Sequence, residues 1–327
     1  MKVDLLDRLD TVGEEAWQGL LARAAFPSPF MSWTWQSAWL AAFGGGRRLR
    51  LLRVGNAAGE LAGLLPLAED GDGVSRLLGG LDVSDYLDLI APAGLEEDVW
   101  AALLQSRATA PETWDLHAIR AASPSATLLP ALAPAYGLRA AAAVEERCPI
   151  LDLPATWDAY LARLTSKQRH ELLRKVRRLE RELPGTVALA SGSAEALEAR
   201  LPAFFTLHRR SHAGKARFMD ARMEGFFRTA VGALAARGQA RLWTLEHDGR
   251  VVASVVCLEW PGAVGLYNSG FDIELAALSP GIVLLAHVIR EALERGVARF
   301  DFLRGEEPYK LGFGARPEDL YRIQVGR

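Results

Sequence analysis

The sequence predicts an α/β protein in which one domain is repeated in tandem. Two segments, 48–67 and 241–258, each have the pattern of a β-hairpin, with turn residues between two apolar, β-rich runs. An offset of 190 residues places Gly59 of the first hairpin on Gly249 of the second. The order of elements around the two hairpins is also the same, which indicates a duplicated domain. Sequence identity between the halves is low, so a chance similarity of two ordinary α/β patterns is the alternative.

The predicted elements follow one order in both halves: helices, the hairpin, a further strand, a helix and a short strand. Helical patterns are expected before the hairpins and again after them, at 14–43, 194–236, 96–105 and 280–294. Each half then has a short strand centred on an aspartate, Asp115 in the first half and Asp301 in the second.

An extended segment at 140–153 separates the halves. Pro149 lies within it and Pro154 directly follows it. We therefore expect an N-terminal domain at 1–147 and a C-terminal domain at 148–327. The N-terminal half carries 12 basic and 19 acidic residues, net −7, whereas the C-terminal half carries 26 and 21, net +5. An anionic ligand would therefore favour the C-terminal half.

The composition excludes several classes of protein. Half of the 327 residues are hydrophobic, which is too many for a disordered chain. The two cysteines, Cys148 and Cys257, are too few for a disulfide framework or a cysteine-rich zinc site. No apolar stretch is long enough to span a bilayer, and no apolar signal segment follows Met1. We expect a cytoplasmic protein, and the net charge of −2 argues against general nucleic-acid binding. The oligomeric state is not predicted.

A strongly basic helix is expected near the start of the second half. Thr156 and Ser166 are candidate N-caps of two successive helices, and Pro184-Gly185 would end the second one. This second helix, 166–182, surrounds its apolar face with seven basic side chains: Lys167, Arg169, Arg174, Lys175, Arg177, Arg178 and Arg181. They form either a solvated surface or a contact to phosphate groups, for which Lys167, Arg169 and Arg174 are best placed.

The helix at 280–294 has a first turn that suits phosphate binding. Ser279 is a good N-cap, Pro280 suits the first helical position, and Gly281 lets a ligand approach the backbone. Because this turn has no acidic side chain, its N–H groups and the helix dipole can meet an anion. The matching helix of the first half begins Glu96-Glu97-Asp98, which would repel phosphate. Either the second half alone keeps an anion site, or Ser-Pro-Gly is simply a good helix start.

Three segments of the second half carry a family resemblance: Tyr267–Asp272, Ser279–Gly281 and Asp301–Lys310. They resemble the GNAT acyltransferase superfamily, and in particular its double-domain branch of FemAB-like proteins and acetyltransferases associated with cellulose biosynthesis. The resemblance implies two tandem GNAT-like domains, each a mixed, mostly antiparallel twisted sheet flanked by helices. It also implies transfer of an acyl group to an amine. The segment 278–282 departs from the usual GNAT phosphate loop, Arg/Gln-x-x-Gly-x-Gly/Ala.

Acyl transfer to an amine needs a base, hydrogen-bond donors for the oxyanion and correct placement of both substrates. Strand alternation separates Asp301 from its two phenylalanine neighbours and makes it a candidate base, with Glu306 in the next loop as another. Tyr309 is a candidate to protonate the leaving thiolate. By resemblance to a FemAB lysine that acts at the reacting ester, Lys310 would polarise the donor carbonyl. The alternatives are a structural aspartate, a solvated loop carboxylate, a packed tyrosine and a surface lysine.

The other candidates would bind substrates. Five are expected to hold the coenzyme: Ser279, Gly281, Ile282, Lys167 and Arg169. Four are expected to contact the acceptor: Tyr267, Asp272, His208 and Arg304. Core packing is the alternative role of Tyr267, and turn capping is that of Asp272. His208 and His212 have a metal-ligand spacing but no third ligand, so no metal is predicted.

The expected function is transfer of an acetyl or other acyl group from acyl-coenzyme A (acyl-CoA) to a small amine, such as a cell-envelope or polysaccharide precursor. One alternative is a FemAB-like transferase that takes an aminoacyl group from tRNA and acts on a peptidoglycan precursor. The other is a GNAT-like scaffold that binds a ligand without catalysis.

Overall fold

The computed structural model describes residues 1–107, 113–211 and 213–327, and the chain divides into two compact units. The first unit consists of Met1–Glu146 with Glu318–Arg327, and the second of Arg147–Pro317. The expected domain at 148–327 therefore needs a correction, because the end of the chain belongs to the first unit.

The physical reason for this correction is strand pairing. Strand β12 (Arg316–Gly326) pairs antiparallel with β5 (Thr113–Arg120). Arg322 of β12 also makes a two-pronged ion pair with Asp115 of β5, with both N–O distances at 2.7 Å. Three side chains of β12 are buried in the first unit: Leu320, Ile323 and Val325. Burial of this apolar surface holds the C-terminal strand in the first unit.

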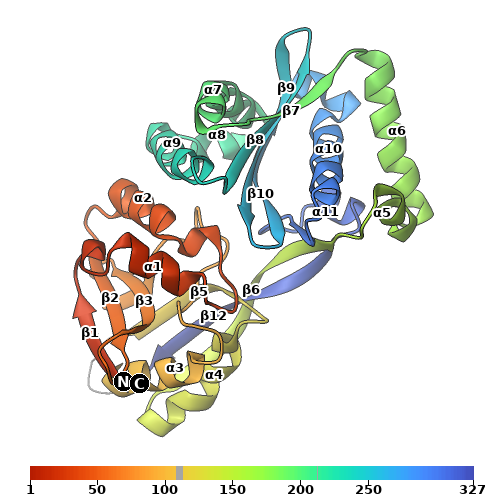
Figure 1. Ribbon diagram of the computed structural model, residues 1–327. Helices are drawn as coiled ribbons and strands as arrows, with labels where there is room; N and C mark the ends of the chain where they lie inside the picture. The colour runs from red at the N-terminus through yellow and green to blue at the C-terminus, as the bar shows by residue number, and fades with distance from the viewer. Residues whose placement is uncertain (108–112, 212) are drawn as a thin grey trace. The chain divides into compact units, whose positions relative to one another are not determined.

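The sheet of the first unit has the strand order β1–β2–β3–β4–β5–β12 (Figure 1). Among the strands that the structure describes in this sheet, only β4 and β5 are parallel. The remaining strands are β1 (Lys2–Leu6), β2 (Arg48–Gly55), β3 (Leu61–Glu69) and β4 (Val74–Leu77). The α-helices are α1 (Glu14–Leu21), α2 (Trp33–Phe43), α3 (Glu96–Arg107) and α4 (Pro124–Leu132). Short 3₁₀ helices lie at η1 (Leu9–Thr11), η2 (Pro29–Met31) and η3 (Ala133–Tyr136).

The sheet of the second unit repeats this topology, with the order β7–β8–β9–β10–β11–β6 and a single parallel pair, β10 and β11. Its strands are β6 (Arg139–Asp152), β7 (Val187–Ala190), β8 (Ala240–His247), β9 (Arg250–Trp260), β10 (Ala263–Phe271) and β11 (Arg299–Asp301). Since β7 to β11 correspond to β1 to β5, the duplicated α/β fold predicted from the sequence is confirmed. In each unit the sixth strand comes from the other half of the repeat: β12 in the first and the end of β6 in the second.

Both hairpins of the sequence repeat are present, and each is closed by the predicted turn chemistry. In β2–β3 the Asn56 side chain accepts hydrogen bonds from the backbone N–H groups of Ala58 and Glu60, each at 2.9 Å. In β8–β9, Asp248 and Gly249 have φ values of 49° and 76°. Two successive positive φ values define the turn that matches the twist of a two-residue hairpin, which explains the Asp-Gly pair.

Helices cover both faces of the second sheet. They are α5 (Trp157–Arg163), α6 (Ser166–Glu182), α7 (Ala194–Ser211), α8 (Ala213–Phe218), α9 (Ala221–Ala235), α10 (Pro280–Glu294) and α11 (Pro308–Gly312), with the 3₁₀ helix η4 (Ile273–Leu278). In Figure 1, α7, α8 and α9 lie on one side of β8–β10, and α6 and α10 lie on the other. None of the helices in the described residues has the length and apolar character that a bilayer span requires.

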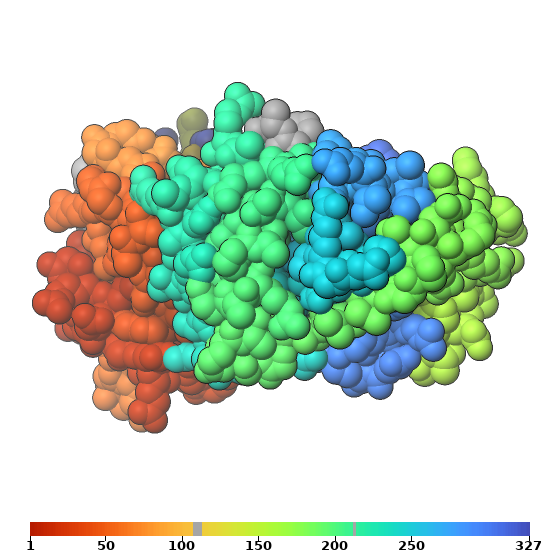
Figure 2. Space-filling view, turned by 90° about the horizontal axis from the view of Figure 1, so that it is seen from above, coloured from red at the N-terminus to blue at the C-terminus, as the bar shows by residue number. Residues whose placement is uncertain are grey.

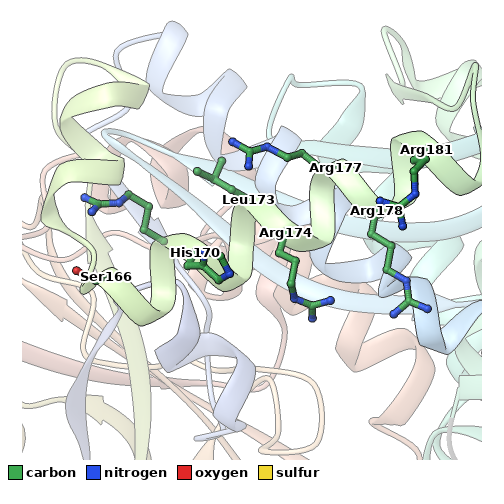
Figure 3. A pocket seen from close by; sticks show the side chains of 8 residues that line it. Ser166, His170, Leu173, Arg174, Arg177, Arg178 and Arg181 are labelled. Carbon is green, nitrogen blue, oxygen red and sulfur yellow. The ribbon is translucent and has the colours of Figure 1, made fainter.

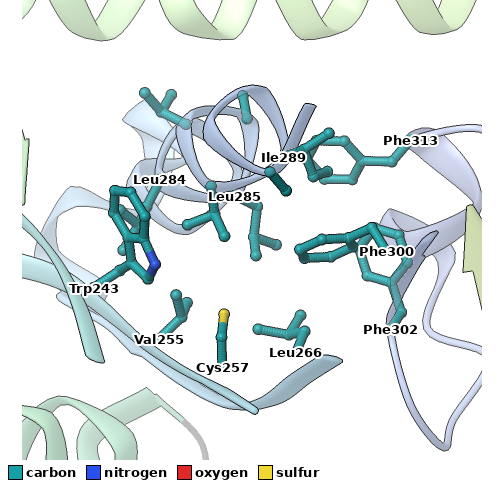
Figure 4. Close-up of a cluster of buried hydrophobic side chains, with 14 of the residues drawn as sticks. Trp243, Val255, Cys257, Leu266, Leu284, Leu285, Ile289, Phe300, Phe302 and Phe313 are labelled. Carbon is teal, nitrogen blue, oxygen red and sulfur yellow. The ribbon is translucent and has the colours of Figure 1, made fainter. Parts of the chain in front are cut away.

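The core beneath α10 is built from apolar side chains of β8, β9, β10 and β11 (Figure 4). Phe300 and Phe302 belong to this core, and their rings lie 5.0 Å apart. Asp301 lies between them in β11 and therefore points to the opposite face. On α6, Leu172 and Leu179 join the same core.

The cap of α6 is Thr165 and not Ser166. The Thr165 hydroxyl accepts a hydrogen bond from the Gln168 N–H at 3.2 Å, and the Gln168 side chain accepts one from the Thr165 N–H at 3.0 Å. This reciprocal pair satisfies two N-terminal donors, whereas Ser166 one residue later would satisfy only one. The predicted cap of the preceding helix is confirmed, because Thr156 accepts from the Ala159 N–H at 3.2 Å.

Asp88 of the first unit gives the stability of the protein a pH dependence. Its carboxylate accepts hydrogen bonds from Ser123, from Ser125 at 2.5 Å and from the Leu89 N–H at 2.7 Å. Burial nevertheless raises the pKa of Asp88 from 3.8 to about 6. The folded state therefore binds the proton more tightly than the unfolded chain, so this contribution to stability is present at low pH and is lost as the pH rises from about 4 to about 6.

The variant Asp88→Asn cannot ionise and should lose this pH dependence. Relative to the wild type, its free energy of unfolding should rise by about 2 kcal/mol between pH 4.5 and pH 7.5, measured by urea denaturation. The exposed Asp82 provides the control, because Asp82→Asn should show no such pH-dependent difference. The same offset of Asp88→Asn from the wild type at both pH values would contradict this interpretation.

Candidate active site

The strands β10 and β11 diverge at one end of the second sheet. They pair in parallel only up to Gly265 and Asp301, where β11 ends, whereas β10 continues to Phe271. A β-bulge at Tyr267 interrupts β10 just beyond the last shared pair. Most of the predicted site residues lie around this divergence, on one or the other face of the sheet.

The first turn of α10 has an unpaired hydrogen-bond donor. Ser279 occupies the N-cap position, but it has left-handed backbone angles (φ 54°, ψ 49°) and its hydroxyl makes no capping hydrogen bond, so the predicted cap interaction is wrong. The N–H groups of Ile282 and Val283 both donate to the Ser279 carbonyl, at 3.0 and 3.2 Å. Pro280 has no N–H, and the Gly281 N–H has no acceptor among the described residues. The turn also has no acidic side chain.

The matching helix of the first unit is different. The first turn of α3 contains Glu96, Glu97 and Asp98, and Glu96 accepts a hydrogen bond from the Gly94 N–H at 2.6 Å. The cavity beside this turn, lined by Asp88 and Glu96 among others, has a volume of only about 10 Å³. Its charge and its size both exclude a diphosphate at this position of the first unit.

A pocket of about 650 Å³ lies between α6, the first turn of α10 and α11, and we call it the α6–α11 pocket. Its apolar lining includes Leu172, Ile282, Tyr309 and Phe313, and its basic residues are Lys167 and Lys175. The structure thus brings together three predicted site residues: Lys167, Ile282 and Tyr309. A volume of this size and a mainly apolar lining with a few charged groups are typical of small-molecule sites.

Lys310 holds the loop between β11 and α11 in place. Its side chain is 4 % exposed, and its ammonium donates to the carbonyls of Arg304 at 2.6 Å and Gly305 at 2.9 Å. It also makes an ion pair with Glu307 at 2.8 Å. Leu303 and Gly305 have positive φ values of 55° and 100°, so this loop needs such support. The Leu303 carbonyl, at 3.4 Å, is a fourth acceptor near the ammonium. Because these acceptors use the three N–H bonds of Lys310, none is left to polarise a donor carbonyl as expected from the sequence.

The other predicted catalytic residues lie around this loop. Asp301 is buried, and its carboxylate accepts a hydrogen bond from the Leu303 N–H at 2.8 Å. Glu306 is exposed and makes an ion pair with Arg147 at 3.5 Å. Tyr309 lines the α6–α11 pocket, and burial together with the charge of Glu307 raises the pKa of its hydroxyl above the ordinary value. Tyr309 therefore stays protonated at neutral pH.

The predicted acceptor residues lie on the face covered by α7, α8 and α9. Tyr267 stacks on Phe227 of α9, with ring centroids 5.3 Å apart. His208 of α7 makes a 2.7 Å hydrogen bond to the Asn268 side chain. Burial and the charge of Lys215 lower the pKa of His208 to about 4, so its ring is neutral at pH 7.

Asp272 does not fit the predicted contact with the acceptor. Its side chain is fully buried, pairs with Arg250 and accepts a hydrogen bond from the Glu274 N–H at 3.2 Å. It therefore caps η4, as the alternative role required. Arg304 is half-buried, and its carbonyl is an acceptor for Lys310. The described residues contain no cluster suited to a metal ion, and His212 lies outside them.

Lys215 is a largely buried cation beside these residues, and the sequence analysis did not name it. It reaches from α8 to the carbonyl of Ser269 in β10, at 2.6 Å. Burial lowers the pKa of Lys215, and the charges of Glu307 and Lys310 also act on it. One signal was available: the chain has only five lysines among its 38 basic residues, and the three at 167, 175 and 310 already belong to the site.

The outer face of α6 carries a row of arginines, which we call the α6 arginine face (Figure 3). Its members are Arg169, Arg174, Arg177, Arg178 and Arg181. Figure 2 shows the segment around α6, in light green, on the molecular surface. Arg174 pairs with Glu171, and Arg181 pairs with Glu182. In the part of the chain that the structure describes, the other three have no carboxylate within ion-pair distance. Arg169 is thus separated from Lys167, which lines the α6–α11 pocket on another face of the helix.

Comparison with known proteins identifies the fold. Residues 166–311 match the family described as acetyltransferase (GNAT) domain. The solved structure of FemX is similar over 98 % of this chain and 97 % of its own, with a TM-score of 0.66 and 12 % identity. The structure of L-PGS from Bacillus licheniformis is similar over 94 % of this chain and 90 % of its own, with a TM-score of 0.57 and 13 % identity. The structure of a tandem GNAT protein from the clavulanic acid biosynthesis pathway is similar over 99 % of this chain and 97 % of its own, with a TM-score of 0.51 and 15 % identity.

No curated protein sequence matches the chain significantly. The structural similarities extend over nearly the whole chain at low identity, so they establish the fold and leave the substrate open. The matched segment contains α6, the first turn of α10 and the β10–β11 divergence. Residues 166–311 are therefore similar to the acetyltransferase (GNAT) domain family, and the chain as a whole has the fold of tandem GNAT proteins.

Proposed function

We propose that this protein is an N-acyltransferase that moves an acyl group from acyl-CoA to an amine. One observation carries the proposal: the unpaired Gly281 N–H at the start of α10, which adjoins the α6–α11 pocket through Ile282. A helix N-terminus without acidic side chains attracts phosphate through its free N–H groups and its dipole. The first turn of α3 in the first unit instead carries three acidic side chains, which supports donor binding by the second unit alone.

In this proposal the coenzyme diphosphate lies at Ser279, Gly281 and Ile282. Lys167 and Lys175, which line the α6–α11 pocket, would neutralise phosphate charge, although Lys175 also pairs with Glu171 of the lining at 3.6 Å. The pantetheine arm would lie on the apolar lining. Arg169 on the α6 arginine face is left for the outer part of the coenzyme or for another anion. The thioester then reaches the divergence of β10 and β11 beside Tyr309.

The chemical step forms a C–N bond and breaks the C–S bond of the thioester. The amine attacks the carbonyl carbon, loses a proton to Asp301 directly or through water, and the coenzyme leaves as a thiolate. Because the Tyr309 hydroxyl stays protonated, it can donate a hydrogen bond to the leaving sulfur. Glu306 is the less suitable base, since it is exposed and pairs with Arg147. Lys310 supports this step by fixing the loop that carries these groups.

Acetyl-CoA is expected to bind and stabilise the second unit. A ligand at 100 times its Kd adds about 2.7 kcal/mol, which corresponds to a Tm increase of roughly 5–10 °C for a unit of this size. The measurement is differential scanning fluorimetry with acetyl-CoA and longer acyl-CoAs, followed by mass spectrometry of amines incubated with the bound donor. If every acyl-CoA left the Tm unchanged, the proposal would be wrong.

The α6 arginine face favours a second candidate, an aminoacyl-tRNA donor as in FemAB-like proteins with a peptidoglycan precursor as acceptor. Three of its arginines lack a carboxylate partner in the described residues, and such a row can contact a phosphate backbone. Binding of charged tRNA without any effect of acyl-CoA would select this donor. Binding of neither donor would leave a GNAT-like scaffold without catalysis.

A further inference from the structure

We infer that Lys215 binds an acidic group of the acceptor, so that the acceptor is an amine that also carries a carboxylate or a phosphate. The inference rests on the proposed N-acyltransferase function and specifies its substrate class. It concerns the face of β10 that α7, α8 and α9 cover, opposite the α6–α11 pocket.

The position of Lys215 is fixed by β10, the strand that continues beyond the divergence. Its ammonium donates to the Ser269 carbonyl at 2.6 Å, and the neighbouring Asn268 holds His208. The rings of His208 and Phe218, at the end of α8, lie 6.0 Å apart, so α8 packs against the same part of α7. The lysine thus lies on the face of β10 that α7, α8 and α9 cover, close to the bulge at Tyr267.

The charges around Lys215 are not balanced. Glu307 and Lys310 act on it electrostatically, but the Glu307 carboxylate is already paired with Lys310 at 2.8 Å. Within the described residues no carboxylate lies within 4.0 Å of the Lys215 ammonium, and the Ser269 carbonyl uses only one of its three N–H bonds. A partly buried ammonium with two donors left over is stabilised by a bound anion.

An acidic group of the acceptor is better placed to be this anion than the phosphate groups of the donor. The phosphate groups of acyl-CoA would lie at the first turn of α10, which belongs to the other face of the sheet. The acceptor amine must approach the thioester from the face of Asp301 and Tyr267, where Lys215 lies. An acidic group on the acceptor would then pair with Lys215 while its amine reaches the divergence.

Two matched pairs of amines test the inference. Glucosamine 6-phosphate is compared with glucosamine, and glycylglycine with glycylglycinamide, so the two pairs separate phosphate from carboxylate. In at least one pair the acidic member should have a kcat/KM at least 10 times higher. Lys215→Ala should raise the KM of that member roughly 10- to 100-fold, the loss expected for one charge-assisted hydrogen bond, and leave the neutral member unchanged. Lys215→Arg should restore part of the affinity.

Arg217→Ala is the matched control, because Arg217 is an exposed cation of the same helix α8. Arg217→Ala should leave the KM and kcat/KM of all four amines unchanged. The Tm increase with acetyl-CoA should be the same in Lys215→Ala as in the wild type, which separates this inference from donor binding. Direct binding of the acidic probes, measured by calorimetry without any donor, tests Lys215 even if another donor is used. The inference would be overturned if Lys215→Ala lowered the kcat/KM of both members of each pair equally, or if the wild type showed no preference for the acidic amine in either pair.

Discussion

Replacing Gly281 with glutamate should abolish the Tm increase produced by acetyl-CoA. The new carboxylate would lie in the first turn of α10, beside the unpaired N–H that we assign to the diphosphate. It would repel the phosphates and compete for the same helix N-terminus. We expect the affinity for acetyl-CoA to fall at least 100-fold.

The fold should survive this substitution. The three heavy atoms nearest to a Cβ at Gly281 would be side-chain carbons of Phe271, the closest at 3.7 Å, which is an ordinary contact. An acidic residue in the first turn also stabilises a helix by about 0.3–1 kcal/mol. The apo Tm of Gly281→Glu should therefore equal or exceed that of the wild type.

Two controls make the result specific. Gly281→Ala adds the Cβ without the charge and should keep most of the acetyl-CoA response. Gly225→Glu places the same carboxylate on α9, where a Cβ meets nothing within 4 Å, and should leave the response intact. A full acetyl-CoA response in Gly281→Glu would place the diphosphate elsewhere.

The second large effect is expected for Lys310→Met, which removes the ammonium and keeps most of the side-chain volume. The carbonyls of Arg304 and Gly305 would lose their donor, and Glu307 would lose its partner. Leaving such groups unpaired costs about 1–3 kcal/mol each, so we expect a loss of about 2–4 kcal/mol in the free energy of unfolding. Turnover should fall at least 100-fold, because the loop beside Asp301 and Tyr309 would lose its fixed position.

Stability and turnover must both be measured for this variant, by urea denaturation and by steady-state kinetics. Lys2→Met is the control, since the Lys2 side chain is 79 % exposed, and it should alter neither quantity. A loss of turnover with unchanged stability would return Lys310 to direct chemistry at the acyl group. A loss of stability with normal turnover would show that the loop needs no clamp for catalysis.

Much of the fold could be predicted because its signals are local. The Asp248-Gly249 turn, the Thr156 cap and the helix at Pro280–Glu294 depend on neighbouring residues, and the structure has all three. The duplication also follows from local patterns repeated at a nearly constant offset. The predicted cap at Ser166 was one residue too late, because the reciprocal hydrogen bonds between Thr165 and Gln168 decide where α6 begins.

The site depends more on contacts between distant segments. The acidic side chains in the first turn of α3 and their absence from that of α10 could be predicted, since this asymmetry is a matter of residue identity. The remaining features of the site depend on long-range contacts. Asp272 is buried under Arg250, Lys310 is committed to loop carbonyls, and Lys215 reaches Ser269 54 residues away. The C-terminal strand joins the first unit because its apolar residues complete the core of that unit. Such pairings are selected by burial and charge in three dimensions, which no local pattern records.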